Sequence, residues 1–188
     1  MDRFQKTILS EGAFSGVGLH TGQPVNVTVK PAAAGLGIRF YKHGRPLEAW
    51  AESTSDGSGE SKRCSWVGSG SDRVLTVEHF TSALAGLGID NILVEVDGPE
   101  MPALDGGAGE YVRLLQDLGI GNQEDAPLEV LKLCEPVFVW QQGSALCAYP
   151  DERLSFHYVL DYDYPYLRSM IYGFEADPAR YAAEVAPA

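Results

Sequence analysis

A glutamate and a histidine stand side by side in the run Thr76-Val77-Glu78-His79, where the sequence predicts that a helix begins. A carboxylate in the first turn is favoured by the positive end of the helix dipole, which helps to keep Glu78 ionised. The neighbouring histidine offers a neutral nitrogen ligand for zinc, and zinc lowers the pKa of bound water towards about 7. A nearby carboxylate can then accept the proton as the water attacks a carbonyl. These residue types therefore permit metal-assisted hydrolysis.

The same residues also have a purely structural interpretation. Glu78 would only complement the helix dipole, and His79 would be a solvated surface residue. Glu-His dipeptides are common, so on spacing alone this simpler interpretation is the one that we favour.

Three other positions carry residue types that could take part in binding or catalysis, but their sequence context indicates this less specifically. The run Gly16–Gly22 (G-V-G-L-H-T-G), which contains His20, is compatible with a phosphate cradle but lacks the Gly-Lys-Ser/Thr ending of a P-loop, so a tight hairpin is favoured. The run P-A-L-D-G-G around Asp105 is typical of a capped turn. Cys64 has no base beside it in sequence, which favours an inert thiol over a nucleophile.

Length and composition limit the classes of protein that are possible. The 188 residues suffice for one domain or one and a half, and 45% hydrophobic with 21% charged residues exclude a disordered or coiled-coil chain. The 14 Lys and Arg against 26 Asp and Glu give a net charge of −12, which argues against a nucleic-acid partner. Three cysteines without a C-x-x-C pair indicate neither a disulfide framework nor a cysteine zinc site. With no integral membrane segment evident, a soluble, cytoplasmic protein is expected.

Residues 1–120 are expected to form a complete α+β domain, with one layer of strands and one of helices. Thr76 is predicted to cap a helix that ends at Gly88, and Asp105 to cap a second one that ends at Gly119. Alternation of apolar and polar residues predicts the strands. These are expected at Arg3–Leu9, Val25–Val29, Gly37–Tyr41 and Asn91–Asp97.

The remaining residues are expected to form part of a second, similar domain, 128–188, after a linker at 121–127. Asp177 followed by Pro178 is a helix-start signal, with proline at the first helical position. Few helical residues are left to cover the strands, so this domain is expected to be incomplete. Its strands are predicted at Val130–Leu133, Val137–Trp140, Ala145–Tyr149, Leu154–Leu160 and Met170–Phe174.

Three long motifs change the balance between these interpretations. They are G-V-G-L-H-T-G at 16–22, T-V-E-H-F-T-S-A-L-A-G-L-G-I-D-N at 76–91 and P-E-M-P-A-L-D-G-G-A at 99–108. Together they resemble the UDP-3-O-acyl-N-acetylglucosamine deacetylase family, the zinc amidases that commit Gram-negative bacteria to lipid A synthesis. Three motifs in the same order and at similar spacing are far more specific than any one alone. The similarity runs through the whole chain and weakens after about residue 122.

The resemblance implies a fold of two similar α+β domains with the site between them. It implies that Glu78 is the general base and that His79 is the first zinc ligand. It implies that His20 and Asp105 support the site, and that Cys64 falls in a segment that lines it. Zinc would polarise the acetamide carbonyl of the UDP-sugar acyl substrate while Glu78 deprotonates the water, which releases acetate and the free amine.

One departure from the family pattern sets a further expectation. The family completes its zinc site with a later His-Lys-x-x-Asp helix, and a further histidine acts as general acid. None of the four histidines here, His20, His43, His79 and His157, begins such a motif. The chain is therefore expected to be an N-terminal portion that is inactive alone and needs a complementing C-terminal segment. The alternatives are a noncatalytic module that binds a nucleotide sugar or a partner, and one half of a split enzyme.

Overall fold

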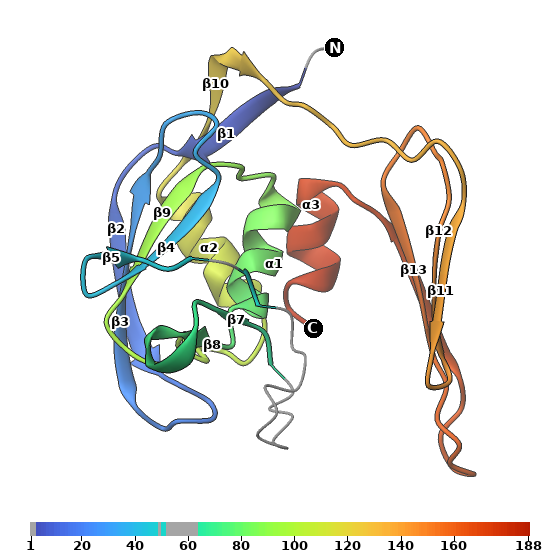
Figure 1. Ribbon diagram of the computed structural model, residues 1–188. Coiled ribbons are helices and arrows are strands. Elements are labelled where there is room, and N and C mark those ends of the chain that lie inside the picture. The colour runs from blue at the N-terminus through green and yellow to red at the C-terminus, as the bar shows by residue number, and fades with distance from the viewer. Residues whose placement is uncertain (1–2, 49, 52–63) are drawn as a thin grey trace.

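The computed structural model describes residues 3–48, 50–51 and 64–188, and its fold is α+β as expected. Figure 1 shows a curved layer of strands at the left with helices α1 and α2 against its concave face. The helical segment at the C-terminus lies beside α1, and two long hairpins stand away from this body.

The main sheet has five strands in the order β2-β3-β9-β4-β5. All neighbours are antiparallel except β4 and β9, which are parallel. In β3 the valines at 25, 27 and 29 are buried and face the helices, because alternate side chains of a strand point to one face. The strands are β2 (Gly12–Val17), β3 (Pro24–Pro31), β9 (Ile92–Val96), β4 (Ile38–Lys42) and β5 (Arg45–Pro46).

Two helices cover this sheet and fill the core with one face each. Helix α1 (Glu78–Leu87) buries Phe80, and helix α2 (Gly109–Asp117) buries Tyr111. The two rings meet edge to face at 5.3 Å between centroids. Gly88 ends α1 with a left-handed φ of 71°, as the sequence predicts. No helix in the described part of the chain is long and apolar enough to cross a membrane.

A small second sheet leads into α1. It consists of β6 (Trp50–Ala51), β7 (Trp66–Val67) and β8 (Val74–Leu75), with a short 3-10 turn η1 (Gly70–Asp72) between the last two. The helix cap that follows differs from the prediction. Val77, not Thr76, occupies the N-cap position, and no side chain caps the helix there, because the hydroxyl of Thr76 is used in a different contact.

Residues 121–127 were predicted to be a linker, and in the structure their local conformation is a strand rather than a loop. They form most of β10 (Ile120–Pro127), which pairs antiparallel with β1 (Phe4–Ile8), the strand predicted at Arg3–Leu9. The polar composition of this run is typical of a loop, but side chains of the run form hydrogen bonds with other segments. Gln123 donates to the carbonyl of Ala32 at 2.9 Å and accepts from Asn91 at 2.8 Å.

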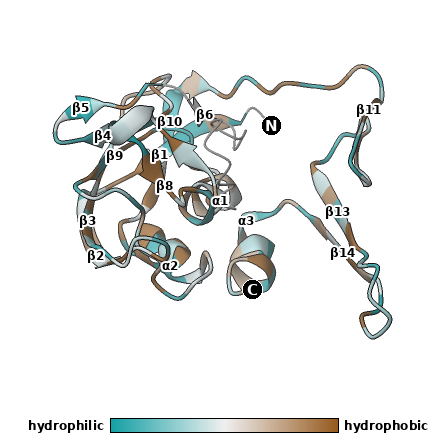
Figure 2. Ribbon diagram, turned by 60° about the horizontal axis from the view of Figure 1, so that its bottom comes forward, coloured by the Kyte–Doolittle hydropathy of each residue, from teal (hydrophilic) through white to brown (hydrophobic). Residues whose placement is uncertain are grey.

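Two antiparallel hairpins follow, and in Figures 1 and 2 they lie apart from the sheet and from α2. β11 (Val137–Gln141) pairs with β12 (Ser144–Ala148), and β13 (Ser155–Leu160) pairs with β14 (Met170–Glu175). These four strands confirm four of the predicted runs, whereas residues 130–133 form no strand. Large apolar side chains such as Trp140, Phe156 and Tyr158 are exposed on them.

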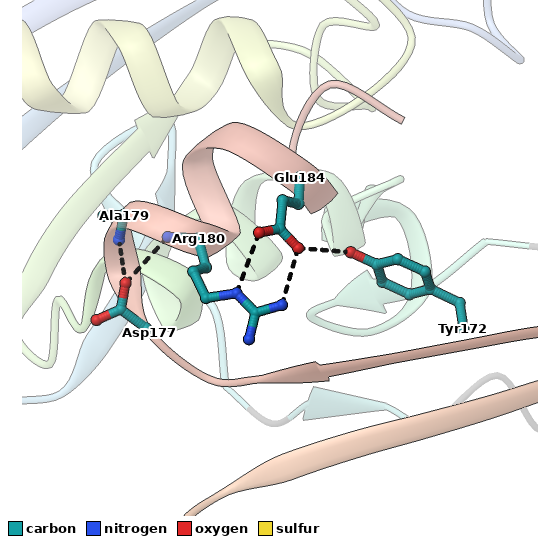
Figure 3. Close-up of polar contacts among 5 residues, drawn as sticks. All are labelled: Tyr172, Asp177, Ala179, Arg180 and Glu184. Atoms are coloured by element: carbon teal, nitrogen blue, oxygen red, sulfur yellow. Dashed lines mark hydrogen bonds and ion pairs between the residues drawn. The ribbon is translucent and has the colours of Figure 1, made fainter.

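The C-terminal helical segment returns from the hairpins to the body. It consists of α3 (Pro178–Arg180) and η2 (Tyr181–Val185), and Asp177 caps it with proline at the first position, as predicted. Figure 3 shows that Asp177 accepts hydrogen bonds from the first turn, and that Arg180 and Glu184 pair within the segment. The hydroxyl of Tyr172, on β14, reaches the carboxylate of Glu184 and joins this segment to the last hairpin.

Candidate functional site

The three sequence motifs converge in space at the N-terminal end of α1. The backbone N–H of Leu75 donates to the carbonyl of Pro99 at 3.0 Å, and Met101 donates back to Leu75 at 2.9 Å. On the other side, Ala103 donates to the carbonyl of Val17 at 2.9 Å. Residues 99–103 therefore lie between the strand that enters α1 and the end of β2. This arrangement brings the runs 16–22, 76–91 and 99–108 into one place.

Glu78 and His79 are both half-buried in the first turn of α1. Oε2 of Glu78 accepts a hydrogen bond of 3.0 Å from the backbone N–H of Ser65. A second bond of 3.3 Å, from Val77 N–H to the carbonyl of Ser65, fastens the same two segments together. Buried Cys64 precedes Ser65, so its segment lies against the start of α1. The Ser65 N–H therefore orients one oxygen of the Glu78 carboxylate at the start of the helix.

Glu100 is a central residue of this region that sequence reasoning missed. Its side chain is fully buried, yet its carboxylate accepts hydrogen bonds from Thr76, His20 and Thr21. Burial acts to raise the pKa of Glu100, but the hydrogen bonds from His20, Thr76 and Thr21 outweigh it and leave the pKa below the usual value. The available signal was a single acidic residue within the otherwise apolar run P-E-M-P-A-L.

His20 and Asp105 occupy different places around this region. The backbone N–H of His20 binds Glu100, while its side chain is exposed. Asp105 lies just before α2, where Oδ1 accepts from Gly107 at 3.1 Å and Oδ2 from Glu110 at 3.0 Å.

Asp105 was predicted to be the N-cap residue of the second helix, but it lies before the N-cap position. Helix α2 begins at Gly109, and its N-cap is Ala108, because Gly106, with a φ of 86°, turns the chain after Asp105. The side chain nevertheless accepts from Glu110, an N–H that the first turn leaves without an intrahelical partner. Within the described residues, no hydrogen bond joins Asp105 to Glu78 or His79.

A catalytic zinc would need a set of ligands among the side chains of this region. Such a zinc takes three protein ligands and leaves one position open. Over residues 3–48, 50–51 and 64–188, no three His, Cys, Asp or Glu side chains gather closely enough to hold a metal ion. His43 lies in the turn between β4 and β5, and His157 lies on β13. The described residues therefore do not by themselves fit a catalytic zinc.

Residues 5–188 match the family model of UDP-3-O-acyl N-acetylglycosamine deacetylase. The chain belongs to this family. It is 36% identical over 162 residues to the UDP-3-O-acyl-N-acetylglucosamine deacetylase of Methylococcus capsulatus. The aligned residues cover 86% of this chain and 53% of that protein. It is 35% identical over 186 residues to the enzyme of the same name from Alcanivorax borkumensis, covering 98% of this chain and 61% of that protein.

A deacetylase of the same name from a Nostoc species is 34% identical over 189 residues, which cover 98% of this chain and 67% of that protein. The chain thus spans between about half and two thirds of the length of these relatives. The resemblance carried by the three motifs is confirmed, and it extends over nearly the whole chain.

Proposed function

We propose that this chain is the N-terminal portion of a zinc-dependent deacetylase that hydrolyses the acetamide of UDP-3-O-acyl-N-acetylglucosamine in lipid A synthesis. The observation that carries the proposal is the meeting of the three family motifs at the start of α1, where Glu78 is held by the N–H of Ser65. Family membership and the names of the relatives support the reaction and the substrate. The proposed location is the cytoplasm.

Glu78 is the proposed general base. Hydrolysis of an acetamide adds the oxygen of water to the carbonyl carbon and breaks the C–N bond, which gives acetate and an amine. The water must lose a proton as it attacks, and a carboxylate can accept that proton. Because Ser65 binds Oε2 of Glu78, the position of that oxygen is restrained relative to the helix. Oε1 makes no hydrogen bond within the described residues, so it is the oxygen proposed to meet the water.

His79 is proposed to be one zinc ligand, with the others supplied from beyond the residues described. Three ligands are needed, and the described part of the chain gathers no such set. We therefore propose that the 188-residue chain alone is inactive and that a complementing C-terminal segment is required. The term complete enzyme is used below for this chain together with that segment.

Three further residues are proposed to support the site. His20 presents an exposed side chain from a loop whose backbone is bound to Glu100. Cys64 lies in the segment that binds Glu78 through Ser65, and Asp105 shapes the turn that leads into α2. A first domain of residues 1–120 and an incomplete second domain of 128–188 remain the proposed division of the chain.

Acetate release from UDP-3-O-acyl-N-acetylglucosamine tests this function. The complete enzyme with zinc is expected to release acetate, and the 188-residue chain with zinc is expected to stay at the metal-only background. No release by the complete enzyme would reject the deacetylase function. Release by the chain alone that disappears in Glu78→Gln would reject the need for a further segment. The mass of the native protein, and any chain that co-purifies with it, would distinguish a longer polypeptide from a split enzyme.

A further inference from the structure

Glu100 keeps a charge inside the protein without a cationic partner. Its side chain has no solvent exposure, and in the part of the chain that the structure describes no Lys, Arg or His forms an ion pair with it. Burial of a carboxylate costs several kcal/mol unless hydrogen bonds replace its water, and a well-packed apolar side chain is often as stable or more so. Stability alone therefore does not explain an acid at this position.

The hydrogen bonds of Glu100 join two segments that are far apart in sequence. Oε1 accepts from the hydroxyl of Thr76 at 2.7 Å and from the N–H of His20 at 3.0 Å. Oε2 accepts from both the N–H and the hydroxyl of Thr21, each at 2.8 Å. One side chain thus connects the loop that carries His20 to the residue that precedes α1.

Close approach of the loop to Glu100 depends on Gly18. A Cβ atom at Gly18 would lie 2.4 Å from Oε2 of Glu100 and 2.5 Å from Oγ1 of Thr21. Both distances are far below van der Waals contact, so any larger residue would displace either the loop or the side chains of Glu100 and Thr21 and disturb their hydrogen bond. Gly18, the middle glycine of the G-V-G-L-H-T-G run, is therefore explained by its closeness to Glu100 rather than by a positive φ.

Thr76 is held in a strained conformation by this contact. Its φ is +57°, a left-handed value that a β-branched residue rarely adopts because it is strained. The direction in which the chain leaves Thr76 sets the start of α1, and Glu78 and His79 follow two and three residues later. The hydrogen bond from the Thr76 hydroxyl to Glu100, at 2.7 Å, holds Thr76 at this turn of the chain.

We propose that Glu100 is the positioning residue of this site, which places Glu78 and His79 through Thr76 and places His20 through the loop 18–22. Being fully buried, Glu100 acts through these residues and meets no reacting atom. The catalytic consequence of this proposal depends on the proposed deacetylase function, whereas the placement itself does not.

The first test measures placement in the 188-residue chain by NMR. Thr76→Val keeps the β-branched shape and removes only the hydroxyl, so the ring signals of His79 are expected to move. Thr76→Ser keeps the hydroxyl and is expected to restore them towards their wild-type positions. Glu100→Gln is expected to move the ring signals of His79 and the amide signals of His20 and Thr21.

Glu95→Gln is the matched control for the loss of one carboxylate. Glu95 is exposed on β9, so its replacement is expected to leave the signals of His20, Thr21 and His79 in place. If Glu100→Gln does not fold, the comparison of Thr76→Val with Thr76→Ser tests the positioning role instead. Unchanged His79 ring signals in folded Thr76→Val, or equal shifts for Val and Ser, would overturn the proposal.

The second test measures catalysis in the complete enzyme. Misplacement of a base by a fraction of an ångström lowers the rate of the chemical step more than substrate affinity. Thr76→Val and Glu100→Gln are expected to lower kcat by about tenfold or more with little change in KM, and Thr76→Ser to regain most of this loss. Equal kcat for wild type and both variants would overturn the positioning role. If the NMR signals move as expected and the wild type releases no acetate, only the proposed function fails.

Discussion

The backbone N–H of Ser65 donates a hydrogen bond of 3.0 Å to Oε2 of Glu78, so a loop residue orients the carboxylate that opens helix α1. A first-turn glutamate that only complemented the helix dipole would need no such partner, because the dipole acts without contact. The bond holds one oxygen, and among the residues that the structure describes the other oxygen makes no hydrogen bond. This geometry suits a base that must receive a proton from one direction.

Replacement of Glu78 by glutamine tests this role in the complete enzyme. The amide keeps the shape of the side chain but cannot accept the proton of water. Loss of a general base costs about 10²–10⁴-fold in rate, so acetate release is expected to fall by that factor while bound zinc persists. The matched control is Glu110→Gln, which removes a first-turn carboxylate from α2 instead. Near-normal turnover of Glu78→Gln would show that Glu78 has only a structural role.

Replacement of His79 by alanine addresses the metal rather than the proton. If His79 is a ligand, loss of its imidazole is expected to lower the zinc content of the complete enzyme, as measured by elemental analysis after dialysis. His43→Ala is the control, because His43 lies in the turn between β4 and β5. Equal zinc content in wild type and His79→Ala would exclude His79 as a ligand.

Local patterns in the sequence were sufficient where one residue determines the backbone. Gly88 ends α1 and Asp177 caps the C-terminal helix, as predicted, because a left-handed C-cap and an N-cap carboxylate are local requirements. The alternating valines of β3 likewise predict a strand with one buried face. Each of these features is decided within a few residues of sequence.

Predictions failed where a partner distant in sequence decides the outcome. Thr76 has the side chain of a cap, but its hydroxyl binds Glu100, 24 residues later. Residues 121–127 have the composition of a linker, but they pair with β1. Glu100 itself was overlooked because its importance comes from donors on two other segments. Alternation and capping rules depend only on residues that are close together in sequence, so they do not predict such long-range contacts.

The depressed pKa of Glu100 predicts how stability depends on pH. Burial opposes ionisation, but the hydrogen bonds from His20, Thr76 and Thr21 prevail, so the folded-state pKa lies below the ordinary 4.5. The unfolded chain then binds the proton more readily than the folded one. The stabilisation is fully present above about pH 5.5, one unit above that ordinary value, and is lost as the pH falls through the folded-state pKa.

Urea unfolding of wild type and Glu100→Gln between pH 7 and pH 3 measures this effect. The difference in unfolding free energy is expected to be constant above about pH 5.5 and to shrink below it. Tyr111 lies near Glu100 and stays neutral over this range, because burial and the charges of Asp105 and Glu100 raise its pKa. Exposed carboxylates titrate equally in both proteins and cancel. A difference that does not change with pH would contradict an ionised, buried Glu100.

Hydrogen exchange is expected to divide the chain at the end of β10. The main sheet, α1, α2 and the pair of β1 and β10 share one core and should exchange slowly. The hairpins β11–β12 and β13–β14 expose Phe156, at 50%, and Tyr158, at 62%, and should exchange faster. Such uncovered apolar surface also favours association at high protein concentration. Equal protection of α1 and of the two hairpins would contradict this division.

The last prediction concerns the contact that returns the C-terminal helix to α1. The ring of Tyr181 lies directly over Gly86, and its hydroxyl is 2.6 Å from Oγ of Ser82. A Cβ atom at Gly86 would lie 2.1 Å from Cδ1 of Tyr181, so no side chain fits there while the segment is docked. Alanine in place of a helical glycine normally stabilises a helix by about 1 kcal/mol. Here the steric conflict is expected to reverse that sign.

Gly86→Ala should therefore speed hydrogen exchange at Tyr181–Ala186 and lower the unfolding free energy. In a Tyr181→Ala background the conflict is gone, and the same Gly86→Ala change should become neutral or stabilising, as helix propensity alone predicts. Ser82→Ala removes only the hydroxyl contact and should have a smaller effect than Gly86→Ala. A stabilising Gly86→Ala in the wild-type background, with exchange at Tyr181–Ala186 unchanged, would show that the helix does not pack on α1 in this way.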